Sequence, residues 1–268
     1  MKIDLTLSLL KRIQQTQAGI AEIKRRYALI EQAVNAELNQ ARLYGSAPAT
    51  MNNPFVWRTI KQSRDMINDL QPFIVSTARE RSLVIAQAVV DDMIAFNRQV
   101  YLPAWLNPQG IPQAVVDRFA SGVYFEQQWS LSSAVWGNNQ RLINQLLERV
   151  GNGIEQQMSA EQLIRMVRNR FRGQMGSAAA DYNATRLVKT MYSNVYQRAL
   201  VEATKDNPFV EGYRWITSGL HTVCPICQER DGRVYTAEEL PLDHPNGACT
   251  WEPVITRSQE QIMDILGI

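Results

Sequence analysis

The chain has 268 residues, of which 45% are hydrophobic and 20% charged, a composition typical of globular proteins with a sizeable core. A net charge of +2 excludes a strong overall field towards nucleic acid or a membrane, so any DNA contact must come from a local patch. The apolar run Leu5–Leu10 is too short for a signal peptide, and no run approaches the roughly 18 apolar residues of a membrane span. We therefore expect no membrane partner and a cytoplasm-like compartment.

Helical periodicity dominates the first hundred residues. Lys11–Tyr44 should form a helix that Gly45 ends, before a loop over Ser46–Pro54. A second helical region should run from about Phe55 to Gln99, with a kink or division at Pro72. The first helix carries an apolar stripe that we expect to pack on the protein itself, with a partner-binding seam as the alternative: Ile20, Ile23, Tyr27, Ile30, Val34, Leu38 and Ala41.

The middle of the chain is less regular. Val100–Pro112 contains three prolines and a glycine, which indicates an irregular connector. Helical pattern resumes near Gln113 and again over Asn138–Val150, and Gly151-Asn152-Gly153 then predicts a break and a domain boundary. Four aromatic residues of this region are expected in the core rather than at an interface: Trp105, Tyr124, Trp129 and Trp136.

Two further helices should follow the break. Ser159–Gln162 has the pattern of a capping box, which opens a helix to about Arg172. Arg165, Arg168 and Arg172 share one face of it, a candidate surface for DNA phosphates, although we favour a solvated face. The next helix, from about Ala178 to Lys205, has an apolar face formed by Leu187, Met191, Val195 and Ala199.

The chain changes character after Asn207-Pro208. Gly212–Ser218 has the residues of a strand, and the turn Asp231-Gly232 leads into a second short strand, Arg233–Tyr235. Thr250–Val254 should be a third strand at a sheet edge, because Pro253 cannot donate to a ladder. An amphipathic helix over Ser258–Leu266 ends the chain.

The expected fold is mainly α. A helical region, residues 1–150, should precede a smaller α+β domain, residues 155–268, that contains a zinc-knuckle-like Cys/His module over residues 221–251.

All cysteines and histidines of the chain lie within residues 221–249. Cys224 and Cys227 are separated by two residues and can reach one ion from a single turn, while His244 and Cys249 form a second pair. Four ligands without an open position are typical of a structural zinc site, so we predict that zinc is bound for structure.

Three alternatives stay open for this module. His221 could ligate in place of His244, or the cysteines could be reduced and buried without a metal. A redox role for Cys224 and Cys227 is disfavoured, because it would require a βαβ setting with the two cysteines opening a helix, and we expect neither.

Carboxylates suited to catalysis are not evident in the sequence. Asp91 and Asp92 are adjacent on a helix and point about 100° apart, so they do not converge as an acid–base pair. Asp231 and Asp243 flank the Cys/His module, but a closed four-ligand site would leave them no activated water. We therefore predict that the protein is not an enzyme.

The C-terminal part, roughly residues 155–256, resembles the phage head morphogenesis domain of the Mu F-like and SPP1-type minor head proteins of tailed phages. Two positions depart from the family pattern: Gly247 stands where the family usually has the first of two cysteines, and Met191 replaces a frequent glutamate. The following segments carry the resemblance: Ala184-Thr185-Arg186 with Lys189-Thr190, Tyr213-Arg214-Trp215, Cys224-Pro225-Ile226-Cys227, Asp231-Gly232, His244-Pro245-Asn246 and Cys249.

The resemblance implies a minor head protein that assists procapsid assembly at or near the portal vertex. The implied partners are the portal protein, the major capsid protein, or both, and the implied location is the virion head after synthesis in the host cytoplasm. An internal virion protein that binds packaged DNA through its arginine-rich helix faces is the alternative.

Overall fold

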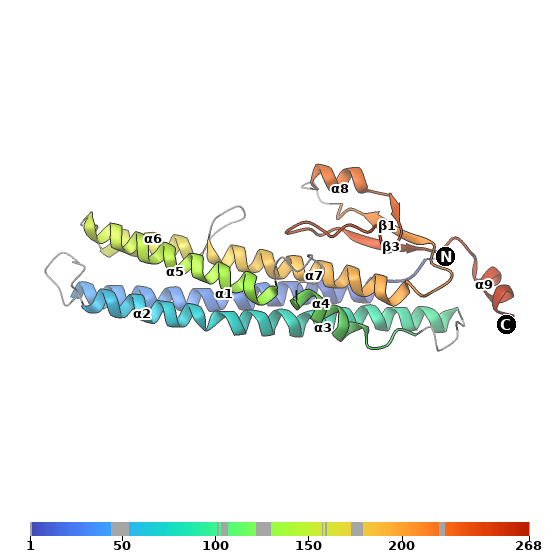
Figure 1. Ribbon diagram of the computed structural model, residues 1–268, viewed down its shortest axis with the longest axis horizontal. Coiled ribbons are helices and arrows are strands. Elements are labelled where there is room, and N and C mark those ends of the chain that lie inside the picture. The colour runs from blue at the N-terminus through green and yellow to red at the C-terminus, as the bar shows by residue number, and fades with distance from the viewer. Residues whose placement is uncertain are drawn as a thin grey trace. The chain divides into compact units, whose positions relative to one another are not determined.

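The computed structural model describes residues 2–43, 54–100, 102, 107–121, 130–156, 158, 160–172, 179–219 and 223–267. Helices dominate these residues, as predicted, and a small antiparallel sheet follows them near the end of the chain (Figure 1). The helices are α1 Thr6–Leu43, α2 Pro54–Asn68, α3 Leu70–Gln99, α4 Ile111–Ser121, α5 Leu131–Glu155, α6 Ala160–Phe171, α7 Ala180–Thr204, α8 Pro225–Arg230 and α9 Gln259–Leu266. The strands are β1 Gly212–Ile216, β2 Val234–Tyr235 and β3 Thr250–Val254. No helix in the described ranges has the length and apolarity needed to cross a membrane.

The chain divides into two compact units, each made of segments far apart in the sequence. The first, here the helical unit, comprises residues 18–77 and 128–187. The second, here the mixed unit, comprises residues 1–17, 78–127 and 188–268 and contains the sheet. The predicted division into residues 1–150 and 155–268 stays a prediction.

The core of the helical unit forms along the predicted apolar stripe of α1. Ile23, Tyr27, Ile30 and Val34 are all buried, as expected from their spacing, and Ile20 is half-buried. The side chains of Leu38 and Ala41 lie outside the described part of the chain. The α1 helix begins at Thr6, five residues before the predicted start, and the loop predicted over Ser46–Pro54 lies almost wholly outside the described residues.

Pro72 divides the second helical region, as predicted. The interruption is at Asp69, and Pro72 lies in the first turn of α3, where its missing N–H removes no helical hydrogen bond.

The predicted break at Gly151-Asn152-Gly153 is wrong. The α5 helix continues through these residues to Glu155. A glycine inside a helix costs only about 1 kcal/mol relative to alanine, which a long amphipathic helix can tolerate. The capping box predicted at Ser159 lies outside the described residues.

Trp136 contradicts the expectation of a core aromatic, because it is 54% exposed on α5. Trp105, Tyr124 and Trp129 lie outside the described residues.

The sheet has the strand order β2-β1-β3 and is antiparallel throughout. Its central strand β1 pairs Trp215 with Trp251 of β3; both side chains are fully buried, with ring centroids 6.2 Å apart. The prediction that Thr250–Val254 is an edge strand is confirmed, and Pro253 lies opposite Tyr213.

The α7 helix is buried on all its faces over two turns. Every side chain from Thr190 to Gln197 is buried. Of the residues predicted for the apolar face, Met191, Val195 and Ala199 are buried and Leu187 is half-buried, so this face is part of a wider buried surface. In the mixed unit, β1, β3 and α8 lie along one side of the C-terminal half of α7 (Figure 1).

A buried polar network stabilises the helical unit. The hydroxyl of Tyr27 lies 3.3 Å from Oδ1 of Asn139 and 3.3 Å from Nδ2 of Asn138, and Asn139 donates to the Ile67 carbonyl at 3.0 Å. Loss of Asn139 removes the acceptor of the Tyr27 hydroxyl and the donor to the Ile67 carbonyl, and a buried polar group left without a partner costs about 1–3 kcal/mol.

We expect Asn139→Ala to lower the free energy of unfolding by about 1–3 kcal/mol. Urea unfolding monitored by helical circular dichroism measures this change. Asn144→Ala is the control, because Asn144 is exposed on the same helix. Equal stability of the two variants would show that the network contributes nothing.

Candidate metal centre

The first two cysteines lie at the start of the short helix α8. Cys224 is its N-cap, and its Sγ accepts a hydrogen bond from the backbone N–H of Cys227 at 3.4 Å. Pro225 occupies the first helical turn, where no N–H is needed. The expectation that the two cysteines do not open a helix is therefore wrong. A βαβ unit needs parallel strands, and the described strands pair antiparallel, so they do not form one.

The other predicted ligands come from the loop between β2 and β3. Asn246 has a φ of 65°, a conformation that asparagine tolerates, and the Gly247 N–H donates to the His244 carbonyl at 2.8 Å. This turn brings Nε2 of His244 to 3.3 Å from Sγ of Cys224. Two ligands of one tetrahedral zinc ion, at about 2.3 and 2.0–2.1 Å from it, lie about 3.6 Å apart.

Five side chains form two groups of possible metal ligands that share Cys227. Cys224, Cys227 and His244 make one group; Cys227, Asp243 and Cys249 make the other. Within each group the ligand atoms lie within 4.8 Å of one another, so the centre could hold a metal ion. The four predicted ligands are thus brought together around Cys227, while His221 lies outside the described residues.

Asp243 is a further possible metal ligand, and that role was not predicted from the sequence. Its buried carboxylate accepts from the His244 backbone N–H at 2.9 Å and from the Ser193 hydroxyl at 3.2 Å. A Cβ atom on residue 247 would lie 2.0 Å from Oδ1 of Asp243. A side chain at residue 247 would therefore overlap the carboxylate, so any residue other than glycine requires Asp243 to move.

Polar side chains of α7 hold this loop in place. Asn194 receives a hydrogen bond from the Asp243 N–H at 3.0 Å, and Gln197 donates to the Cys249 carbonyl at 2.8 Å. Thr190 accepts from the Asn246 N–H at 3.1 Å. The sequence contained a signal for this contact, since Thr190, Asn194 and Gln197 recur at helical spacing and so share one face of α7.

Arg12 of α1 also contacts the loop. Its two terminal nitrogens lie 3.5 Å from the carbonyls of Ala248 and Cys249, and its guanidinium stacks at 4.7 Å over the ring of Tyr196. More than 230 residues separate Arg12 from this loop, and no sequence pattern linked them.

The electrostatic environment differs between the cysteines. The backbone N–H of Cys227 lowers the pKa of Cys224, with a smaller contribution from His244. Burial raises the pKa of the Cys227 thiol, and the neighbouring Cys224 and Cys249 raise it further. A metal ion would reverse this effect at Cys227, because coordination deprotonates a thiol.

The loop residues are shifted as well. Burial lowers the pKa of His244, but the Pro245 carbonyl, Asp243 and Cys224 outweigh it and leave that pKa raised. For Asp243, burial raises the pKa, and the neighbouring His244 partly opposes this effect.

The arginines predicted for DNA phosphates lie in the helical unit. Arg172 and Arg168 form ion pairs with the buried carboxylate of Glu31 at 2.5 and 3.9 Å, whereas Arg165 is exposed. Two of the three positive charges are therefore partly neutralised within the unit.

Asp91 and Asp92 do not converge, as predicted. Asp92 is buried and accepts from the Ser8 N–H at 2.9 Å, while Asp91 is exposed and accepts from Gln87.

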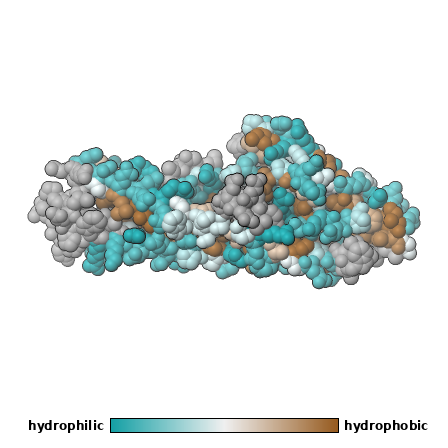
Figure 2. Space-filling model, in the orientation of Figure 1, coloured by the Kyte–Doolittle hydropathy of each residue, from teal (hydrophilic) through white to brown (hydrophobic). Residues whose placement is uncertain are grey.

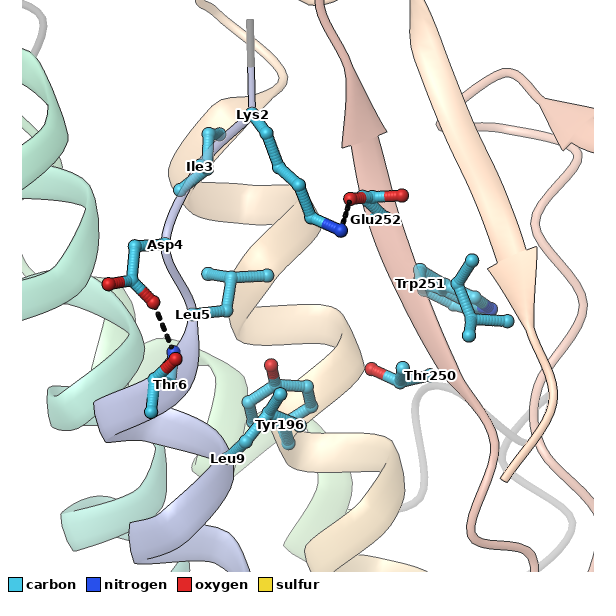
Figure 3. A pocket seen from close by; sticks show the side chains of 11 residues that line it. Lys2, Ile3, Asp4, Leu5, Thr6, Leu9, Tyr196, Thr250, Trp251 and Glu252 are labelled. Carbon is cyan, nitrogen blue, oxygen red and sulfur yellow. Dashed lines mark hydrogen bonds and ion pairs between the residues drawn. The ribbon is translucent and has the colours of Figure 1, made fainter. Parts of the chain in front are cut away.

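A pocket of about 500 Å³ lies beside Tyr196 in the mixed unit (Figure 3). The segment before α1 forms one wall, and Lys2 reaches across to pair with Glu252 of β3 at 2.7 Å. Asp4 accepts from the Thr6 N–H at 2.9 Å, so the charged residues that line the pocket bind one another or the backbone. Apolar side chains make up much of the remaining lining: Ile3, Leu5, Leu9, Ile216 and Trp251.

No protein-family model, curated protein or solved structure matches this chain.

We expect Gly247→Ala to lower stability and metal binding, because its methyl group would overlap the Asp243 carboxylate. Asp243→Ala creates the space for that methyl group, so the double variant should be more stable than Gly247→Ala alone. Thermal unfolding of the four proteins forms a double-mutant cycle, with an expected coupling of about 0.5–3 kcal/mol. Additive effects would contradict this overlap.

Proposed function

We propose that the protein is non-enzymatic and that a structural zinc ion joins α8 to the loop before β3. The ligands are Cys224, Cys227, His244 and Cys249, and the ion supplies charge neutralisation and folding free energy at this point. The closest support is the 3.3 Å separation of Cys224 Sγ and His244 Nε2 across two segments of chain. Four protein ligands leave no position for a reactive water, so the centre serves structure rather than hydrolysis.

We further propose that the chain is a minor head protein of a tailed phage, acting in procapsid assembly at or near the portal vertex. One observation supports this proposal: the segments that resemble the family are far apart in the sequence, but they lie together in the small sheet and around the cysteines. Tyr213-Arg214-Trp215 lies in the central strand, and Cys227 belongs both to a group of possible ligands with His244 and to one with Cys249. The protein would be made in the host cytoplasm and retained in the virion head.

Exposed apolar side chains support binding to the portal protein or the major capsid protein. Leu7, Leu10 and Ile13 recur every three residues along α1 and are each about half exposed. Figure 2 shows apolar surface over α8 and α9, where Ile226 and Ile265 are exposed. Large apolar residues on a surface are the usual anchors of protein interfaces.

DNA binding is the less supported role. About six to ten phosphate contacts are needed for strong salt-dependent affinity, and the ion pairs of Arg168 and Arg172 with Glu31 reduce the charge available for them.

Deletion of the coding sequence from the phage genome should lower the yield of DNA-filled particles, with restoration by the wild-type protein supplied in trans. Cys224→Ser should not restore the yield, because it removes a metal ligand. Glu229→Ala is the matched control on α8 and should restore it, since its ion pair with Arg233 is exposed. Normal particles that form without the protein, and virions that lack it, would reject the assembly role.

A further inference from the structure

Arg12 lies against the buried side of the candidate metal centre. Its guanidinium interacts electrostatically with Asp243 and with Cys249, besides its contacts to the carbonyls of Ala248 and Cys249. Both hydrogen bonds are 3.5 Å long, at the outer limit for such bonds, so they alone contribute little. The position of the charge is therefore the more informative feature.

The charge of the proposed centre explains why a cation is needed there. A zinc ion brings two positive charges, three cysteine thiolates bring three negative charges, and a neutral imidazole brings none, so the centre carries one excess negative charge. Cys227 and Cys249 are buried, and a buried charge without a partner is strongly destabilising. A carboxylate at Asp243, which lies in the same group as Cys227 and Cys249, adds a further negative charge, so the guanidinium of Arg12 offsets part of the excess.

We propose that Arg12 is the counter-charge of the metal–thiolate centre, a positioning residue that raises metal affinity without touching the ion. This role rests on the proposed zinc site. Residues that support metal ligands from outside the coordination sphere change metal affinity by about 10- to 100-fold when they are removed.

A second consequence follows from linkage. Because Arg12 and the ion stabilise each other, metal binding strengthens the attachment of the start of α1 to the loop, and loss of the metal weakens it by the same factor. The same segment carries buried Ile3 and Leu5 and the ion pair of Lys2 with Glu252. Metal loading therefore adds to the attachment that these metal-independent contacts of the segment already provide.

A matched control is available in Arg198. It donates to the Leu240 carbonyl at 3.1 Å and stacks at 5.4 Å over the ring of Trp251, so it also joins an aromatic ring to the same loop. Its contacts are of the same kind as those of Arg12, but its guanidinium donates to the Leu240 carbonyl, whereas that of Arg12 lies at the carbonyls of Ala248 and Cys249.

The test is zinc affinity, measured on the purified full chain by competition with a chromophoric chelator. Arg12→Met keeps the apolar stem and removes the charge, and we expect it to weaken zinc binding by about 10- to 100-fold. Arg12→Lys keeps the charge and should remain within about threefold of wild type, and so should Arg198→Met. Circular dichroism of each zinc-free variant reports whether it folds.

The outcomes separate the possibilities. Wild-type affinity in Arg12→Met, or equal losses in Arg12→Met and Arg198→Met, would overturn the counter-charge role in favour of packing. If Arg12→Met does not fold, Arg12→Lys decides: near wild-type affinity supports the charge, and a loss as large as about 10-fold rejects it. Less than about 0.3 mol of zinc per mole of wild-type chain would overturn both this role and the zinc site. If the wild-type chain binds zinc and Arg12→Met binds it equally well, only the role of Arg12 is overturned.

Discussion

Hydrogen bonds between α7 and the loop before β3 are the constraint on which the rest of the mixed unit depends. The helix is buried on all faces from Thr190 to Gln197, so its polar side chains cannot reach water. Each unpaired polar group in that position would cost about 1–3 kcal/mol. The backbone of residues 243–249 supplies partners for Thr190, Asn194 and Gln197, which fixes the loop along the helix.

Once the loop is fixed, the neighbouring features follow from it. Cys249 is followed directly by β3, whose Trp251 packs against Trp215 of the central strand. The turn at Asn246 directs His244 towards Cys224 at the start of α8. The Asp243 carboxylate fills the space beside Gly247. Arg12 of α1 contacts the same loop at the Cys249 carbonyl. A metal ion at Cys227 would thus stabilise an arrangement that α7 has already organised, which is the usual relation between a structural metal and its supporting residues.

Local patterns predicted the elements well, because hydrophobic spacing and turn residues act within a few residues of the chain. The stripe of α1, the division at Pro72 and the edge strand with Pro253 were all predicted in this way. The break at Gly151–Gly153 failed because packing of a long helix outweighs the modest cost of two glycines. The α8 helix was missed because six residues are too few for a periodicity to be recognised.

The sequence predicted the candidate metal ligands, but it did not predict the residues that hold the ligand loop in place. Cysteine and histidine are rare in this chain, so their clustering within thirty residues indicated a centre at once. The position of Asp243 beside the module was visible in the sequence, but its role depends on burial and on its bond to Ser193, which the sequence does not show. Arg12 is a common residue type whose contact lies across the chain, and no local pattern indicates it. Gly247 illustrates the difference: its departure from the family pattern was visible, but its reason, the carboxylate of Asp243, required the structure.

X-ray absorption at the zinc edge of the purified full chain tests the metal centre most directly, because it reports the ligand atoms themselves. A centre formed by Cys224, Cys227, His244 and Cys249 predicts three sulfur atoms at about 2.3 Å and one nitrogen at about 2.0–2.1 Å. A chain without zinc, or a zinc ion surrounded only by oxygen and nitrogen, would contradict it.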